Sequence, residues 1–284
     1  MTDRAGAVDA HHHVWDLSVR DQDWLTGRAL APLRRNFTVE ELAPQARAAG
    51  VSRTVLVQTV TVAEETPELL ALARGSDLIG AVVGWTDLTR PDVADELARL
   101  RELPGGRHLK GVRHQVQGEP DPEWLLRDDV RRGLAAVADA GLVYDLVVLP
   151  HQLPVCARAA ERHPELTFVL DHLGKPPVAA GEPHAWAAAV RALAALPNTV
   201  CKLSGLVTQA DPLSWTVEDL APCADTVLEA FGPARLMFGS DWPVCTLAAR
   251  YADVVDVARE LVGGLGERER QEVFADTAAR VYGL

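Results

Sequence analysis

Eight short apolar runs alternate with longer amphipathic stretches along the whole chain. The runs expected as strands are Ala7–Val14, Arg53–Gln58, Leu78–Trp85, Leu109–His114, Val143–Leu149, Thr167–His172, Thr199–Ser204 and Leu236–Asp241. The stretches expected as helices are Val39–Ala49, Glu64–Arg74, Pro91–Leu103, Pro122–Ala140, Gln152–Arg162, His184–Leu196, Val217–Phe231, Leu247–Val262 and Glu267–Tyr282. Near-continuous apolar strands are typical of parallel sheets that are buried on both faces.

The number and spacing of these elements predict an α/β fold, a (β/α)8 TIM barrel that forms one domain over residues 1–284. A doubly wound open sheet is the competing arrangement. It is disfavoured because no G-x-G-x-x-G follows any of the strands and the alternation continues to a count of eight. At the start of the first helix, the pattern Thr38-x-x-Glu41 predicts a capping box.

Composition excludes several classes of protein. The chain is 48% hydrophobic, which supplies a large core, and its formal net charge of −12 argues against nucleic acid or an anionic membrane as a partner. No apolar run reaches the roughly 18 residues that span a bilayer, and the first residues lack the order of a signal peptide. The four cysteines are widely spaced without a C-x-x-C pair, which indicates free thiols in a reducing cytosol. We therefore expect a cytoplasmic protein with a small-molecule partner, and the oligomeric state stays open.

The segment Val8–Asp16 contains three consecutive histidines at the end of the first expected strand. Because side chains alternate along a strand, His11 and His13 share one face and His12 takes the other, where it packs behind the strand. Two imidazoles projected side by side can hold a metal ion or polarise a carbonyl group. An expression tag would not be embedded in an apolar strand pattern.

Polar residues gather at the carboxyl ends of the expected strands, which is the rim where barrel enzymes carry their active sites. In chain order these residues are His11, His13, Arg113, His114, His151, Asp171, His172, Lys175, Lys202, Ser204 and Asp241. The opposite ends of the strands carry only helix caps and solvent-facing charges. This asymmetry predicts a catalytic site at one rim.

Several of these residues also have a structural interpretation. His172 is compatible with a core histidine bonded to a carbonyl group, Arg113 with an ion pair, and Asp241 with an Asx turn before Trp242-Pro243. A rim tryptophan such as Trp85 packs more often than it binds a ligand. The chain contains 25 Arg and only three Lys, and Lys110, Lys175 and Lys202 all lie in or just after expected strands. Either these positions need a compact ammonium group, or lysine occurs there by chance in an arginine-rich chain.

Five ordered motifs resemble a known family. They are Asp9-x-His11-x-His13-x-Trp15-Asp16, Lys110-Gly-Val-Arg113-His114, Asp171-His172-Leu-Gly-Lys175-Pro176, Lys202-Leu-Ser204-Gly205 and Phe238-Gly-Ser-Asp241-Trp242-Pro243. Together they resemble the amidohydrolase superfamily, in the branch that includes sugar-acid lactonases and a pyrone-dicarboxylate lactonase. The resemblance spans residue 8 to about 282 and implies a distorted TIM barrel whose first-strand histidines and last-strand aspartate form the hydrolytic centre.

The chain departs from the two-metal members of that superfamily. Its fourth strand offers no glutamate, and the histidine after the fifth, His151, lies beyond Pro150. The resemblance therefore implies at most one divalent ion, with zinc preferred, held by His11, His13, His172 and Asp241. Because some relatives work without a metal, a metal-independent reaction stays open.

The predicted function is a hydrolase of carbohydrate metabolism that opens a lactone ring, with a sugar-acid (aldono) lactone as the preferred substrate. Asp241 is expected to act as general base, with His172 and Arg113 as further catalytic residues. His114, His151, Lys175 and Trp85 are expected to bind the substrate. The alternatives are a metal-dependent decarboxylase of the same superfamily and a non-catalytic barrel that binds a sugar acid.

Overall fold

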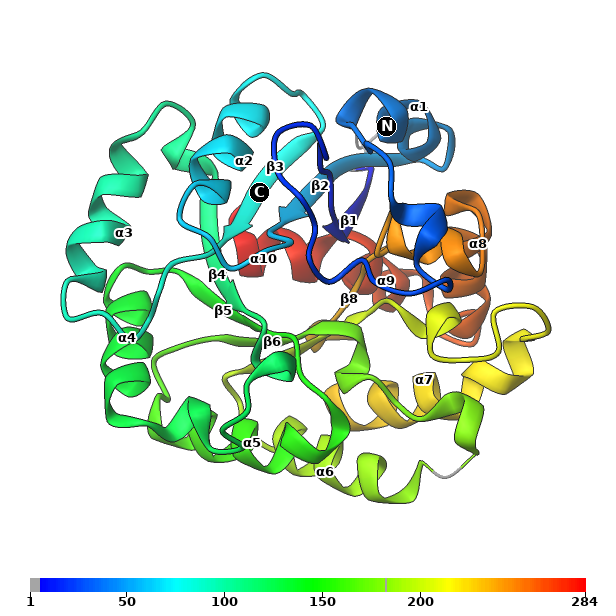
Figure 1. Ribbon diagram of the computed structural model, residues 1–284. Helices are drawn as coiled ribbons and strands as arrows, with labels where there is room; N and C mark the ends of the chain where they lie inside the picture. The colour runs from blue at the N-terminus through cyan, green and yellow to red at the C-terminus, as the bar shows by residue number, and fades with distance from the viewer. Residues whose placement is uncertain (1–5, 182) are drawn as a thin grey trace.

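A computed structural model of the chain describes residues 6–181 and 183–284. Eight parallel strands pair in chain order, and helices surround them (Figure 1). The strands are β1 (Ala7–His12), β2 (Val51–Val57), β3 (Ile79–Gly84), β4 (Leu109–His114), β5 (Val143–Leu146), β6 (Phe168–Leu170), β7 (Thr199–Leu203) and β8 (Leu236–Phe238). The helices are α1 (Val39–Ala48), α2 (Glu65–Arg74), α3 (Val93–Glu102), α4 (Asp128–Asp139), α5 (Leu153–Arg162), α6 (His184–Ala194), α7 (Val217–Phe231), α8 (Tyr251–Leu261), α9 (Glu267–Gln271) and α10 (Thr277–Tyr282). The predicted (β/α)8 barrel is confirmed.

The inside of the barrel has two levels. Below the carboxyl rim it is filled by small apolar side chains, among them Val8, Ala10, Val55, Ala81, Val143, Val169 and Val200. Nearer the carboxyl rim the inward side chains are charged. Asp145 on β5, Asp171 just past β6 and Lys202 on β7 each follow an inward valine by two residues, and all three are buried. Alternation along a strand places these charges on the same inner face as the valines. The interior therefore changes from apolar to ionic toward the carboxyl rim.

The barrel closes between its last and first strands at that same rim. The N–H of Asp241 donates to the carbonyl oxygen of His11 at 2.8 Å, and the N–H of His13 donates to that of Trp242 at 2.7 Å. The register between β1 and β2 also shifts between Asp9 and His12, as in a β-bulge. The bulge turns His11 and His13 inward, whereas His12 faces outward and contacts the hydroxyl of Thr54 at 2.9 Å, as its position in the strand predicts.

Several elements are shorter than predicted. The residues from Asp171 to Gly174 form a tight turn instead of prolonging β6, and β8 ends at Phe238. The last two helices are likewise shorter, because α8 begins at Tyr251 and a π-helical segment, Glu272–Asp276, separates α9 from α10. In both strands the predicted end lies past the last paired apolar residue, within Asp171-His172 and within Gly239-Ser240-Asp241. Periodicity alone therefore placed these ends too late.

The capping box predicted at Thr38 does not form. The Thr38 side chain makes no capping hydrogen bond, and the carboxylate of Glu41 accepts two hydrogen bonds from Arg35, at 2.8 and 2.6 Å. The charge-assisted pair replaces the weaker reciprocal cap.

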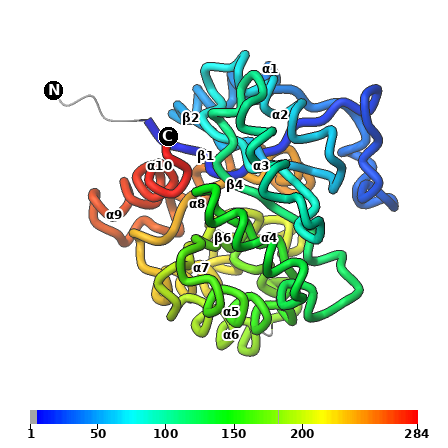
Figure 2. The backbone as a smooth tube through the Cα atoms, turned by 90° about the vertical axis from the view of Figure 1, so that its left-hand side faces the viewer, coloured from blue at the N-terminus to red at the C-terminus, as the bar shows by residue number. Residues whose placement is uncertain are grey.

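The chain's last helix packs against the amino end of the barrel. Figure 2 shows α10 and the C-terminus beside the start of β1. Tyr282, on α10, is buried among the small inner residues of the strands. In the described part of the chain, no helix is both long enough and apolar enough to cross a membrane.

Candidate active site

Three histidines at the rim each have one ring nitrogen held in a fixed contact. Nδ1 of His13 lies 2.8 Å from the carbonyl oxygen of Val57, which can only accept a hydrogen bond, so Nδ1 carries the proton and Nε2 is free. Nδ1 of His172 lies 2.9 Å from the hydroxyl oxygen of Ser204. Nδ1 of His11 lies 3.1 Å from the ammonium nitrogen of Lys202 and 3.2 Å from Oδ1 of Asp171. Such contacts orient each ring and direct its other nitrogen.

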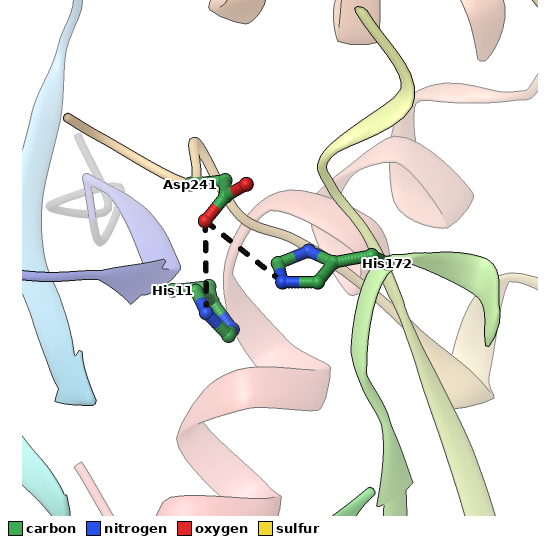
Figure 3. Close-up of side chains that lie close together, drawn as sticks. All are labelled: His11, His172 and Asp241. Atoms are coloured by element: carbon green, nitrogen blue, oxygen red, sulfur yellow. Dashed lines mark ion pairs between the residues drawn. The ribbon is translucent and has the colours of Figure 1, made fainter. Parts of the chain in front are cut away.

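The Nε2 atoms of these histidines face the carboxylate of Asp241. Oδ1 of Asp241 lies 3.6 Å from Nε2 of His13 and 3.8 Å from Nε2 of His172. Nε2 of His11 lies 3.9 Å from the same oxygen. Figure 3 shows His11 and His172 approaching Asp241 from β1 and from the end of β6. All four side chains are buried, so water does not compete freely with these contacts.

A left-handed turn after β6 carries His172 into the site. His172, Leu173 and Lys175 have φ of 52°, 55° and 56°, and Gly174 between them has φ of 70°. A residue with a Cβ pays about 1–2 kcal/mol in this conformation. Asp241 is also left-handed, with φ of 57°. Strain at three residues that the sequence assigned to the site indicates a conformation maintained for function.

Gly205 makes room for the His172 ring. Its φ is +69°, and a Cβ at this position would lie 2.8 Å from Nδ1 and 2.9 Å from Cγ of His172. Gly239 plays the same part for His11, since a Cβ there would lie 2.8 Å from Cβ of His11. Each histidine therefore packs against a glycine just past a neighbouring strand.

Arg113 is anchored as well as directed at the site. Its Nη1 lies 2.9 Å from Oδ2 of Asp171, and its Nε and Nη2 donate to Oε1 of Gln58 at 3.0 and 2.9 Å. Nη1 also lies 3.3 Å from Nε2 of His11. The guanidinium group thus forms an ion pair, as one interpretation of the sequence predicts. It also contributes positive charge to the site.

Lys202 holds the centre of the buried ionic level. Its ammonium nitrogen lies 2.6 Å from Oδ2 of Asp145 and 2.9 Å from Oδ1 of Asp171. The hydroxyl of Tyr282 reaches the same Asp145 oxygens at 3.1 and 2.9 Å. Together with Arg113, Lys202 balances the charge of the two carboxylates, which a buried network requires.

Burial and charge set the protonation states. Burial alone raises the pKa of Asp241, but His172 and His13 stabilise the carboxylate, so its pKa lies below the ordinary value. Burial lowers the pKa of His172 to about 4 and that of His11 well below its usual range. Burial also lowers the pKa of Lys175. At neutral pH the site therefore combines an ionised Asp241 with neutral rings at His11 and His172.

A cavity of about 170 Å³ opens onto this cluster. Of the residues chosen from the sequence, it is lined by His13, Arg113, His172, Lys175 and Asp241. The polar residues that the sequence analysis did not select are Thr59, Gln115, Gln117, Thr208 and Gln209. Trp24, Val147 and Val244 complete it. The cavity is therefore small, polar and lined by the carboxyl-end loops, as a barrel active site requires.

Three residues expected to bind substrate do not line this cavity. Nε2 of His114 lies 2.7 Å from Glu119, and its Nδ1 accepts a hydrogen bond from Nε1 of Trp85 at 3.0 Å. The His114 ring also stacks on Trp124, with centroids 4.2 Å apart. His151 is exposed in the turn before α5. Both nitrogens of His114 are thus occupied by neighbours.

Some of the residues that the sequence analysis did not select carried a signal in the sequence. Asp145 interrupts an apolar strand two residues after an inward valine, where a charge must face the barrel interior, as Lys202 does on β7. Gln115 and Gln117 follow β4 with the spacing of one strand face. Gln209 and Trp24 lie in loops whose paths no local pattern specifies.

The residues present fit a divalent metal ion. One nitrogen each from His11 and His172 and one oxygen from Asp241 lie within 4.8 Å of one another, and Nε2 of His13 lies 3.2 Å from Nε2 of His11. Imidazole and carboxylate ligands of this kind suit zinc and related ions. Oδ1 of Asp171 accepts no hydrogen bond of good geometry. It lies 3.2 Å from Nδ1 of His11, where it can accept the Nδ1 proton of a ligating imidazole.

Comparisons with known proteins show the family of this chain. The amidohydrolase family matches residues 8–284. An L-fucono-1,5-lactonase from Burkholderia multivorans is 40% identical over 98% of this chain and 96% of its own length. One from Burkholderia ambifaria is 37% identical over 87% of this chain and 83% of its own length. A solved amidohydrolase from Burkholderia multivorans with bound zinc superposes with a TM-score of 0.93, at 40% identity, over 98% of this chain and 99% of that one. The chain belongs to the amidohydrolase family.

Proposed function

We propose that this protein is a hydrolase that opens the ring of a sugar-acid lactone. The observation that carries the proposal is the ionised Asp241 carboxylate, faced by three Nε2 atoms at the base of a small polar cavity. Two similar proteins, at 40% and 37% identity, are L-fucono-1,5-lactonases. An aldono-1,5-lactone of that size is therefore the first substrate to test.

Asp241 supplies the acid–base chemistry. Its carboxylate accepts a proton from a water molecule as the water oxygen attacks the ring carbonyl carbon. The bond from that carbon to the ring oxygen then breaks, and Asp241 returns the proton to the departing oxygen. The product is an open-chain hydroxy acid that contains the oxygen of the water molecule, and at neutral pH it ionises to the carboxylate and releases one proton.

Positive charge in the cavity stabilises the tetrahedral intermediate. Arg113 and Lys175 both line the cavity, and Lys175 donates a hydrogen bond to Gln117. Charges fixed in a buried site stabilise a developing oxyanion more strongly than in water. His11, His13, His172 and Asp241 would hold a zinc ion, which when bound polarises the carbonyl group. A similar protein in its solved structure contains zinc.

Amide and hydroxyl groups suit a neutral, hydroxylated substrate. Gln115, Gln117 and Gln209 line the cavity together with Thr59 and Thr208. Amide side chains both donate and accept hydrogen bonds, as sugar hydroxyl groups do. We propose that these residues, rather than His114, His151 or Trp85, bind the hydroxyl groups of the lactone.

The proposal is tested by a pH-indicator screen of aldonolactones with purified protein, run with and without a chelator. We expect one proton released per turnover with at least one six-carbon lactone, far above the rate of spontaneous opening. Loss of the signal in chelator, restored by zinc, assigns the carbonyl-activating role to metal. Release of CO₂ from an aromatic acid, with no lactone opened, would instead identify a decarboxylase.

A further inference from the structure

Two glutamine side chains on the cavity wall are each held at one end of the amide group. Gln115 and Gln117 follow β4, and both line the cavity. Nε2 of Gln115 donates a hydrogen bond to the carbonyl oxygen of Thr59, and Oε1 of Gln117 accepts one from the ammonium group of Lys175. A carbonyl oxygen can only accept and an ammonium group can only donate, so each contact fixes which way its amide is turned.

The two amides therefore present opposite ends to a ligand. The free atom of Gln115 is Oε1, which can only accept a hydrogen bond, and that of Gln117 is Nε2, which can only donate one. Among the described residues, neither atom has a hydrogen-bond partner, and neither is completely buried. Because both side chains line the cavity, these are the atoms that a bound molecule can reach.

The backbone around these amides is held in place. The buried carboxylate of Glu65 accepts hydrogen bonds from the N–H group of Thr59, at 2.8 Å, and from its hydroxyl group, and so fixes the loop to which Gln115 is bound. The N–H group of Gln117 donates to the carbonyl oxygen of Val147 at 3.1 Å. Turning either amide over would bring oxygen against oxygen or N–H against ammonium. The polarity of the wall is therefore set before a ligand binds.

The two ends differ in what they can bind. A sugar hydroxyl group donates and accepts, whereas a ring oxygen, a carbonyl group, a carboxylate or a fluorine substituent only accepts. A hydroxyl group can therefore satisfy Oε1 of Gln115, but none of those other groups can. Nε2 of Gln117 is satisfied by any acceptor. Sites built around a hydrogen bond to a substrate hydroxyl group discriminate strongly against analogues that lack it.

We propose that Gln115 and Gln117 are specificity-determining residues of opposite hydrogen-bond polarity: Gln115 requires a hydroxyl group of the lactone as a donor, and Gln117 requires an acceptor. The inference deepens the proposed function, on which its meaning for catalysis rests. It narrows the substrate class to lactones with a free hydroxyl group on the Gln115 side, and it excludes a carboxylate or a keto group at that place.

The first experiment measures binding of 1,5-lactams of six-carbon sugar acids, which carry an amide in place of the ester and resist hydrolysis. Calorimetric titration of a panel of stereoisomers identifies the tightest binder, which is compared with its deoxy and deoxyfluoro analogues at each ring hydroxyl position. We expect a first position where both analogues bind about 10–100-fold more weakly than the parent lactam. We expect a second position where the fluoro analogue binds at least about fivefold tighter than the deoxy analogue. Binding of no lactam, or equal tolerance of fluorine at every position, would overturn the proposal.

Variants assign the two positions. Gln115→Met removes the acceptor at similar size, and we expect the preference for hydroxyl over fluorine at the first position to fall below about threefold. Gln117→Glu keeps an oxygen for Lys175 and presents a second oxygen in place of Nε2, so the advantage of fluorine over hydrogen at the second position should vanish. Residues that only support the fold would weaken binding of all analogues alike when they are changed, which would contradict the proposal.

Gln209→Met is the matched control. Gln209 lines the same cavity, but its amide has no hydrogen-bond partner in the part of the chain that the structure describes, so either end can face a ligand. We expect the binding ratios at both assigned positions to match wild type in this variant. Loss of those ratios would assign the effect to general loosening of the cavity and would overturn the proposal.

The outcome is separable from that of the lactonase assay. Lactam binding needs no turnover, so the polarity test gives an answer even in a protein that opens no lactone. Conversely, a protein that opens lactones but binds every analogue of the lactam equally well would keep the proposed function and refute the role of Gln115 and Gln117.

Discussion

The two halves of the barrel rim both present histidines, but they use them differently. On the side built by β1, β6 and β8, His13 and His172 each contact a neighbour through Nδ1 and direct Nε2 toward Asp241. On the side of β3 and β4, both ring nitrogens of His114 form hydrogen bonds, one with Glu119 and the other with Trp85. The first arrangement leaves reactive nitrogens, whereas the second completes a packed cluster.

The difference teaches that a strand-end histidine is not by itself a site residue. What distinguishes the two sides is a ring nitrogen directed toward an ionised carboxylate. The proposed function therefore predicts large kinetic effects on the β1–β6–β8 side and mainly effects on stability on the other.

The largest effect is expected for Asp241→Asn. The amide keeps the size of the side chain but cannot accept the proton of the attacking water, so kcat should fall about 10²–10⁴-fold. Steady-state kinetics on the best lactone measures the loss, and circular dichroism checks the fold. A variant that retains near wild-type kcat would remove Asp241 from the mechanism.

Gly205→Ala tests the placement of His172. The added Cβ would lie 2.8 Å from Nδ1 of His172 and must displace the ring, so we expect zinc affinity or activity to fall about 10–100-fold. Gly141→Ala is the matched control, because Gly141 also has a positive φ, +64°, yet its Cβ would meet nothing within 4 Å. Equal losses of activity in both variants would mean that backbone strain alone is responsible.

The pH dependence of the reaction distinguishes the buried histidines from ordinary ones. Because the pKa of His172 is lowered to about 4, the ring stays neutral down to that pH and Asp241 stays ionised. We expect kcat/KM to hold steady from neutral pH to about pH 5 and to fall about tenfold per unit below about pH 4. A circular dichroism spectrum that is unchanged at the same acidic pH values excludes unfolding as the cause. An acid limb centred near 6.5 would show that His172 titrates like an exposed imidazole.

The smallest kinetic effect is expected for His114→Ala. Loss of its two hydrogen bonds and its stacking on Trp124 should destabilise the fold by about 1–3 kcal/mol, while kcat and KM change less than about threefold. Urea unfolding and steady-state kinetics measure the two quantities separately. A tenfold rise in KM with unchanged stability would restore His114 to the substrate site.

Much of this arrangement could be predicted from the sequence because barrel strands converge at one rim. The gathering of His11, His13, His172 and Asp241 at one rim follows from the count of strands, and the shared face of His11 and His13 follows from side-chain alternation. The contacts that occupy both nitrogens of His114 could not be predicted in the same way, because its partners lie in loops.

Two further features depend on tertiary structure. The left-handed turn from His172 to Lys175 opposes the local preference of its residues, so only the packing around it can impose it. The pairing of Lys202 with Asp145 is completed by Tyr282, which reaches the barrel interior only once α10 has docked. Sequence patterns locate the charged residues but not the partners that they meet.

The central claim is that Asp241 activates water for attack on a lactone carbonyl carbon. The most direct test is turnover of an aldono-1,5-lactone in ¹⁸O-water by wild type and Asp241→Asn in parallel, followed by mass spectrometry. The account predicts one ¹⁸O atom in the product carboxylate, formed by wild type far faster than by the variant or by buffer alone. Equal rates for wild type and Asp241→Asn, or no lactone opened by wild type, would contradict it.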